Sequence, residues 1–268
     1  MAFDLTRTFR IPADDEFESL PKAPVAEAVI HFRTPTSGLL SREELTSRLA
    51  AELPDFNVIR NVVAFGFEAT VDAEAETEHV KRSLERTGLR LEKRTDSENL
   101  VVQFLRDGLV FSQLDPYPGW HPFVVAALNV WRVYRNVFAP REIERIGVRY
   151  ISKTALRTVS EVKDLLEFPP TRPREMDFLD IRGFVFQTRF GVPGNPYEVA
   201  VARTIQPGSP DRPSEMYLIM DIDVATNSVT SLEGDLLSTR LREMRWLKNK
   251  AFFGSITQMA TDRFKGEA

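Results

Sequence analysis

An α+β fold is predicted for this chain, with antiparallel β-sheet packed against two long helices. Three observations lead to this prediction. Short β-rich segments recur along the sequence, two long segments carry apolar residues at helical spacing, and turn-forming residues separate neighbouring segments. With 268 residues, of which 43% are hydrophobic and 28% charged, the chain has enough material for one large or two modest cores.

The N-terminal part predicts an arm, a strand and a capped helix. Residues 1–24 are polar and bounded by prolines, which is typical of an extended arm, and VAEAVIHFR after them is typical of a strand. Ser41 and Glu44 have the spacing of a capping box, so we expect a helix to begin there and to end at Pro54.

The next part predicts strands on both sides of a helical segment. NVVAFGFEATVDAE and GLRLEKRTDSE are β-rich, whereas the charged run between them, which contains His79, favours a helix. Asp107 and Gly108 then separate two apolar runs, and this dipeptide is a strong hairpin signal.

The segment FSQLDPYPGWHPF predicts a corner between that hairpin and a long helix. Tyr117-Pro118-Gly119-Trp120 suits a type II turn, because Pro fixes φ and Gly supplies a positive φ. Pro122 suits the first turn of a helix, which we expect to run to Pro140. Its apolar stripe consists of Phe123, Ala127, Trp131, Tyr134 and Phe138.

Two roles are open for this corner. The first is structural, with Tyr117 and Trp120 packed against the core. The second is a ligand-binding or partner-binding rim formed by Tyr117, Trp120 and His121, because an aromatic corner beside a helix N-terminus can hold an anion or a ring.

The second half repeats this order of elements loosely. Strands are predicted at IERIGVRYISK, GFVFQTRFGV, NPYEVAVARTIQ and EMYLIMDIDVAT, followed by the helix EGDLLSTRLREMRWLKNKAFFGSIT. We therefore expect four regions, which are an arm (1–24), a first sheet-plus-helix half (25–156), a proline-rich link (157–182) and a second half (183–268). The two halves are either related or parts of a single α+β domain.

Composition excludes several classes of protein. The formal net charge of −4 gives no overall attraction to nucleic acid or anionic membranes, and the absence of Cys excludes disulfides, thiolate nucleophiles and zinc fingers. Asp4 and Arg7 interrupt any signal peptide, and no apolar run is long enough to cross a membrane. A cytoplasmic protein is expected.

Catalytic motifs are also missing. The sequence has no HExxH, GxSxG, Walker or GxGxxG motif, and its three histidines, His31, His79 and His121, match no local ligand spacing. We expect no cofactor and no metal, and an enzyme is less expected than a binding protein.

Two charged features are alternatives for function. Asp221 and Asp223 share one face of a predicted strand, which is either solvated or, with a third oxygen ligand, a Mg²⁺ site. Arg242, Arg245 and Lys248 form a basic row on the last helix, and we expect it to face solvent or a protein partner rather than nucleic acid.

Four phrases carry a resemblance. LPKAPVAEAVIHFR, DPYPGWHPF, RIGVRYISK and NKAFFGSIT, in this order from Leu20 to Thr257, are similar to a family of sporadically distributed, uncharacterised bacterial proteins of roughly this length. The resemblance implies a bacterial protein, and patchy occurrence is typical of accessory or defence-linked genes.

The leading hypothesis is a non-enzymatic binding or regulatory protein that acts through a protein partner, such as an antitoxin, immunity or defence-system component. One alternative is an enzyme with a non-local, metal-dependent site near Asp221 and Asp223. The other is a small-ligand binder with an apolar pocket between the sheet and a long helix.

Overall fold

The structure is a computed structural model in which five α-helices and nine strands are described. It describes residues 8–35, 38, 40–72, 77–171, 173–176, 178–208, 211, 215–226, 228–232 and 235–266. Its elements are β1 (Val25–Arg33), α1 (Arg42–Glu52), β2 (Asn57–Asp72), β3 (Thr77–Arg94), β4 (Asn99–Leu105), β5 (Gly108–Leu114), α2 (Trp120–Phe138), β6 (Arg145–Leu156), α3 (Val162–Leu165), β7 (Val185–Gly191), β8 (Tyr197–Pro207), β9 (Met216–Thr226), α4 (Leu236–Phe253) and α5 (Gln258–Lys265).

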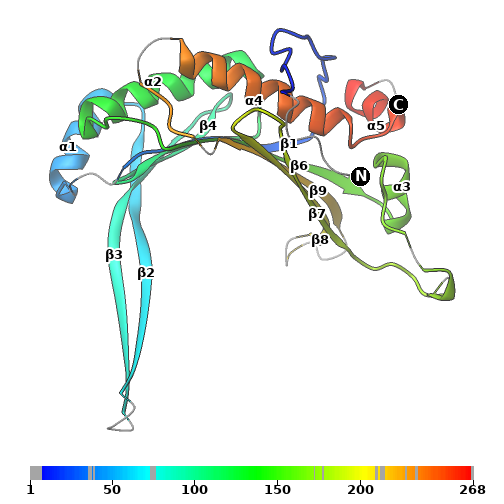
Figure 1. The fold of residues 1–268 in the computed structure, drawn as a ribbon, viewed down its shortest axis with the longest axis horizontal. Coiled ribbons are helices and arrows are strands. Elements are labelled where there is room, and N and C mark those ends of the chain that lie inside the picture. The colour runs from blue at the N-terminus through cyan, green and yellow to red at the C-terminus, as the bar shows by residue number, and fades with distance from the viewer. Residues whose placement is uncertain are drawn as a thin grey trace.

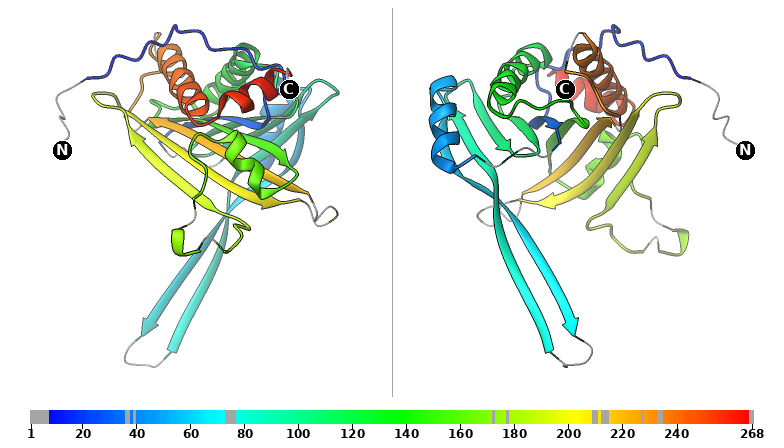
Figure 2. Two further views of the ribbon diagram at one scale, coloured as in Figure 1. Left: turned by 90° about the vertical axis from the view of Figure 1, so that its right-hand side faces the viewer. Right: turned by 60° about the vertical axis from the view of Figure 1, so that its left-hand side comes forward.

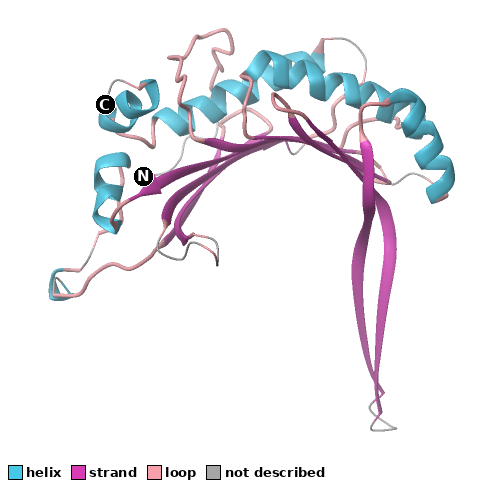
Figure 3. Cartoon of the chain, turned by 180° about the vertical axis from the view of Figure 1, so that it is seen from behind, coloured by secondary structure: helices cyan, strands magenta, loops and turns pink. Residues whose placement is uncertain are grey.

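All nine strands belong to one antiparallel sheet in the order β2-β3-β4-β5-β1-β6-β9-β8-β7. The sheet is strongly curved, and α2 and α4 both lie along its convex face (Figures 1 and 3). The α+β class and the antiparallel sheet are therefore confirmed. The expectation of two long helices is too simple, because α1, α3 and α5 are also present.

The core lies between the sheet and these helices. Alternate residues of the central strand β1 point toward the helices, so that Ala28, Ile30 and Phe32 are fully buried. The ring of Phe32 stacks on Trp131 of α2 with 4.6 Å between centroids. The same alternation leaves the other side chains of each strand on the concave face, which no helix covers in Figure 1.

Several local predictions are confirmed. Ser41 Oγ accepts a hydrogen bond from the Glu44 N–H at 3.1 Å, and the Glu44 carboxylate accepts one from the Ser41 N–H at 3.0 Å. This capping box opens α1, as the spacing predicts. The predicted hairpin is formed by β4 and β5, but its turn is Arg106-Asp107, one residue before the predicted Asp107-Gly108.

The helix predicted around His79 is wrong. Residues 77–94 form β3, which pairs along its length with β2. The two strands extend beyond the rest of the sheet as a long hairpin (Figure 2). Local charge patterning favoured a helix, but cross-strand pairing with a distant segment decides the conformation here.

The described part of the N-terminal arm lies against the helices. Residues 8–24 contain no helix or strand and run across the helical layer (Figure 2). The Phe17 ring stacks on Phe253 of α4 with 5.8 Å between centroids, and the Trp246 indole N–H donates to Asp15 at 3.2 Å. The arm thus adds a layer over α4.

The end of the chain differs from the prediction. The last helix was expected to continue to Thr257, but α4 ends at Phe253, and the separate helix α5 begins after Thr257. The Thr257 hydroxyl caps α5 by accepting a hydrogen bond from the Ala260 N–H at 3.2 Å. Among the described helices, none is long and apolar enough to cross a membrane.

Candidate functional site

The predicted corner forms the start of α2. Gly119 precedes the helix with φ 97° and ψ 170°, so the positive φ is confirmed, whereas a type II turn would have ψ near zero at this position. Pro122 lies in the first turn, as predicted. No side chain caps this helix and its first turn contains no acidic residue, which leaves the N–H groups of Trp120 and His121 without an intrahelical acceptor.

Four aromatic side chains pack together behind the corner. The hydroxyl groups of Tyr117 and Tyr150 are 2.7 Å apart, and their rings meet edge to face. Both rings contact Phe123, which also contacts Trp120 at 6.3 Å between centroids. Burial raises the pKa of Tyr117 to about 12, so both its hydroxyl group and that of the more deeply buried Tyr150 stay neutral at physiological pH.

A cavity of about 620 Å³ opens beside this cluster, and we call it the corner pocket. Its walls come from the arm, the turn before α2, strand β6 and helix α4. The residues that define it for the argument below are Tyr117, Trp120, Tyr150, Arg245, Lys248 and Asn249.

Arg245 and Lys248 give the corner pocket its charge. No carboxylate lies within ion-pair distance of either side chain in the described part of the chain. The ammonium of Lys248 instead lies 4.1 Å from the centre of the Tyr150 ring. Burial, and then the nearby charge of Arg245, lowers the pKa of Lys248 to about 7. At neutral pH the pocket therefore holds one full positive charge and one that is partly populated.

Asn249 adds an uncommitted amide. The residue is 9% exposed and lines the corner pocket, yet its side chain makes no hydrogen bond to any described residue. The amide is therefore free to donate hydrogen bonds to a ligand in the pocket and to accept them. Two acidic residues also line the cavity, but Glu18 is paired with Lys265 at 2.5 Å and Asp115 is exposed.

The remaining residues of the two predicted sites lie outside the corner pocket. His121 is exposed on the first turn of α2. Arg242 is exposed and pairs with Asp14 of the arm at 3.3 Å. The basic row is therefore divided, because Arg242 contacts the arm whereas Arg245 and Lys248 line the cavity.

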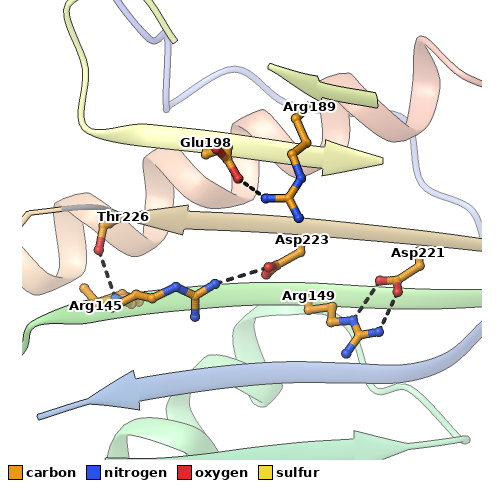
Figure 4. Close-up of polar contacts among 8 residues, drawn as sticks. Arg145, Arg149, Arg189, Glu198, Asp221, Asp223 and Thr226 are labelled. Carbon is orange, nitrogen blue, oxygen red and sulfur yellow. Dashed lines mark hydrogen bonds and ion pairs between the residues drawn. The ribbon is translucent and has the colours of Figure 1, made fainter. Parts of the chain in front are cut away.

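Asp221 and Asp223 lie on the concave face, as their spacing predicted. Asp221 accepts two hydrogen bonds from the Arg149 guanidinium, at 2.8 and 2.5 Å, and Asp223 accepts one from Arg145 at 3.2 Å (Figure 4). Burial raises the pKa of Asp223, and the two arginines oppose this shift.

These ion pairs leave little capacity for a metal ion. Mg²⁺ prefers several free oxygen ligands, and here the strongest acceptors already bind guanidinium groups. Within the described ranges, no group of three or more His, Asp or Glu side chains is placed to hold a metal.

The sequence suggested parts of the corner pocket but not its assembly. Tyr117 and Trp120 were predicted as one feature, and Arg245 and Lys248 as another, and the structure brings all four to one cavity. Tyr150 and Asn249 were missed. Lys248 and Asn249 do follow Trp246 and Leu247 beside the apolar stripe of the helix, and this position was a signal of partial burial.

No protein-family model matches the chain, and no curated protein or solved structure matches it either. We therefore infer a function from the chemistry of the corner pocket alone.

Proposed function

We propose that the protein is a non-enzymatic binding protein whose corner pocket holds a small molecule with an anionic group attached to a ring. One observation carries the proposal. Arg245 and Lys248 line the same aromatic cavity, and neither has a carboxylate partner among the described residues. A partly buried cation without a partner is costly, and an anionic ligand would offset that cost.

The other groups of the cavity suit the same ligand. An arginine fork, an ammonium and an amide N–H₂ group all donate to the oxygens of phosphate or carboxylate. The free N–H groups at the start of α2 add further donors and a favourable helix dipole. Trp120 and Phe253 supply aromatic surface for an attached ring. A cavity of about 620 Å³ is within the range of small-molecule sites.

Titration calorimetry with phenyl phosphate tests the proposal, because this probe joins a tetrahedral anion to one ring. We expect binding of phenyl phosphate and none of benzyl alcohol, which has the ring without the charge. Lys248→Met and Arg245→Gln should each weaken binding by about tenfold or more, the usual effect of losing a hydrogen bond to a charged group.

Arg242→Gln is the matched control, because Arg242 lies on the same helix but points to the arm. It should bind phenyl phosphate as the wild type does. Equal binding by all three variants, or no binding by the wild type, would contradict the proposal.

A second function is favoured by the lowered pKa of Lys248. A neutral amine can attack the carbonyl carbon of a keto acid and form an imine with loss of water, as in enzymes that use a lysine nucleophile. Treatment with pyruvate and sodium borohydride would reduce such an imine to a stable secondary amine. A mass increase on Lys248 in the digested protein would support this enzyme, and its absence would exclude imine chemistry with this substrate.

The wider sequence hypothesis remains part of the proposal. We infer a cytoplasmic accessory protein of a defence or toxin-antitoxin system that binds a protein partner in response to its ligand. The motivation is the family resemblance together with the missing catalytic motifs. Co-purification of a partner from the native host only when phenyl phosphate is present would support this inference. Loss of that dependence in Lys248→Met would link partner binding to ligand binding in the corner pocket.

We further propose that the chain contains two related halves. In the first half, four strands lie in the spatial order β1-β5-β4-β3, and α2 follows them in the chain. In the second half, four strands lie in the matching order β6-β9-β8-β7, and α4 follows them in the chain. The corresponding helix starts differ, since α2 begins after Gly119 whereas α4 begins after Asp235. A carboxylate at the start of α4 disfavours an anion there, which fits a ligand site in the first half alone.

A further inference from the structure

A second cavity lies on the other side of α4, between this helix and the edge of the sheet. Its volume is about 510 Å³, and we call it the edge groove. The side chains that line it and enter the argument are Phe168, Phe186, Thr188, Phe190, Arg203 and Lys250. It shares no lining residue with the corner pocket.

Large apolar side chains are exposed along the edge groove. Phe168 is 68% exposed, Phe186 48% and Phe190 53%. Phe186 and Phe190 lie two strand positions on either side of Thr188, so all three side chains of β7 point toward α4. Contiguous exposed aromatic surface of this kind marks an interaction site.

Strand β7 is the last strand of the sheet. It pairs with β8 on one side, and no described strand pairs with its other side. An edge of this kind presents unpaired N–H and C=O groups, which can bind an extended segment of another chain by strand addition.

The charge in the edge groove is positive and uncompensated. Arg203 is 7% exposed, and its Nη2 donates to the Ser255 hydroxyl at 2.7 Å, but its Nε has no hydrogen-bond partner. The Thr188 hydroxyl is also buried without a partner. Lys250 adds a second cation, and no Asp or Glu is among the described residues that line the groove. A carboxylate would complement these groups.

We propose that the edge groove binds an extended segment of a partner protein, in which an acidic side chain alternates with aromatic or aliphatic ones. The backbone of the segment would pair with the free edge of β7. Apolar side chains at alternate positions would then cover Phe186 and Phe190, and the acidic side chain would reach Arg203.

A second copy of this chain fits the edge groove less well. Strand β7 reads VFQTRFG and contains no acidic residue, so pairing of two β7 strands would bring no carboxylate to Arg203. Such a pair would also place the cations of both grooves near one another, which is unfavourable. Charge complementarity therefore favours a different, acidic partner.

Selection from a phage-displayed library of random dodecapeptides on the immobilised full-length protein tests this inference. We expect enrichment of peptides in which Asp or Glu alternates with aromatic or aliphatic residues. The enriched peptide should bind Arg203→Gln and Phe190→Ser at least tenfold more weakly than the wild type. Phe190→Ser keeps the test sound if Arg203→Gln fails to fold, because Phe190 is on the surface.

Arg189→Gln is the control, since Arg189 lies on the same strand but points to the concave face, where it pairs with Glu198. It should bind the peptide as the wild type does. No enriched pattern, or equal binding to Phe190→Ser, would overturn the inference. So would a wild-type dimer in light scattering that Phe190→Ser converts to monomer, because the occupant would then be a second copy. Phenyl phosphate binding is measured separately, so failure of either site is distinguishable.

Discussion

The corner pocket and the concave face of the sheet both contain arginines, but they differ in what those arginines bind. On the concave face, Arg149 and Arg145 pair with Asp221 and Asp223 from the neighbouring strand (Figure 4). In the corner pocket, Arg245 has no carboxylate partner among the described residues. These two arginines on the concave face thus have carboxylate partners, whereas the cations of the corner pocket have none that the structure describes.

This difference separates a structural role from a binding role. Charges that satisfy one another stabilise a solvated face modestly and leave little capacity for a ligand. Charges held in a partly buried cavity without partners cost stability, and proteins tolerate that cost where a ligand binds. The predictions below test each side of this contrast.

The largest expected effect is on the aromatic cluster behind the corner, which Phe123 holds together. Phe123 is 1% exposed and contacts Tyr117, Trp120 and Tyr150, so Phe123→Ala should lower the free energy of unfolding by about 4 kcal/mol. Urea denaturation measures this. Val125→Ala, at an exposed position of the same helix, should change it by less than about 0.5 kcal/mol. A loss below about 1 kcal/mol for Phe123→Ala would show that the aromatic cluster is not packed as described.

Trp120→Ala should have a smaller effect on stability. Trp120 packs on Phe123 but is only partly buried, so we expect a loss of about 2 kcal/mol, below the usual range for a fully buried aromatic. Because the side chain also lines the cavity, phenyl phosphate binding should weaken. An unchanged melting temperature with lost binding would make Trp120 a recognition residue without a packing role.

Lys248→Met should stabilise the protein, by about 1 kcal/mol at pH 6. The pKa of Lys248 is lowered to about 7 by folding, from 10.5. The unfolded chain therefore holds the proton more tightly than the folded one. Burial of the charged Lys248 lowers the stability of the wild type by its full amount below pH 7, and this loss shrinks as pH rises toward 10.5. The gain in the variant should shrink over the same interval. Thermal unfolding at pH 6 and pH 9 measures it, and a loss of stability at pH 6 would contradict the unpaired-charge account.

The smallest effect is expected on the concave face. The Arg149 side chain is 49% exposed, so Asp221→Asn should lower the free energy of unfolding by less than about 1 kcal/mol. A double-mutant cycle with Arg149→Gln should give a coupling energy of similar size. High salt should reduce that coupling. A coupling above about 2 kcal/mol would mean that the face contributes far more to stability than a solvated ion pair does.

The sequence predicted those parts of the fold that local signals specify. The capping box at Ser41, the hairpin at Gly108 and the helix that follows Gly119 all depend on residues a few positions apart. The helix predicted at His79 was wrong because pairing with β2 overrode a charged, helix-like pattern. Helix α5 was missed because the apolar stripe of α4 gave no clear end before Thr257.

The candidate site could be predicted only in pieces. The residue types at the corner and on the last helix were informative, but their meeting depends on how α4 packs across β6, which no local pattern encodes. The alternation around Asp221 gave the correct face of the strand, whereas its pairing with Arg149 required the register between β6 and β9.

The most direct test of the central claim is the number of protons taken up when phenyl phosphate binds at pH 8. It is obtained by calorimetry in two buffers with different heats of ionisation. Phenyl phosphate is already fully charged at this pH, because the second pKa of a phosphate monoester is about 6. Lys248, with a pKa of about 7, is mostly neutral before binding, and a bound anion favours its charged form.

We therefore predict uptake of close to one proton per molecule bound by the wild type, and by the Arg242→Gln control. Lys248→Met should show no uptake and weaker binding. For the wild type, affinity should fall as pH rises above about 7, because protonating Lys248 then costs more. Binding without proton uptake, and with the same affinity in Lys248→Met, would contradict the claim that the unpaired charge in the corner pocket recognises the ligand.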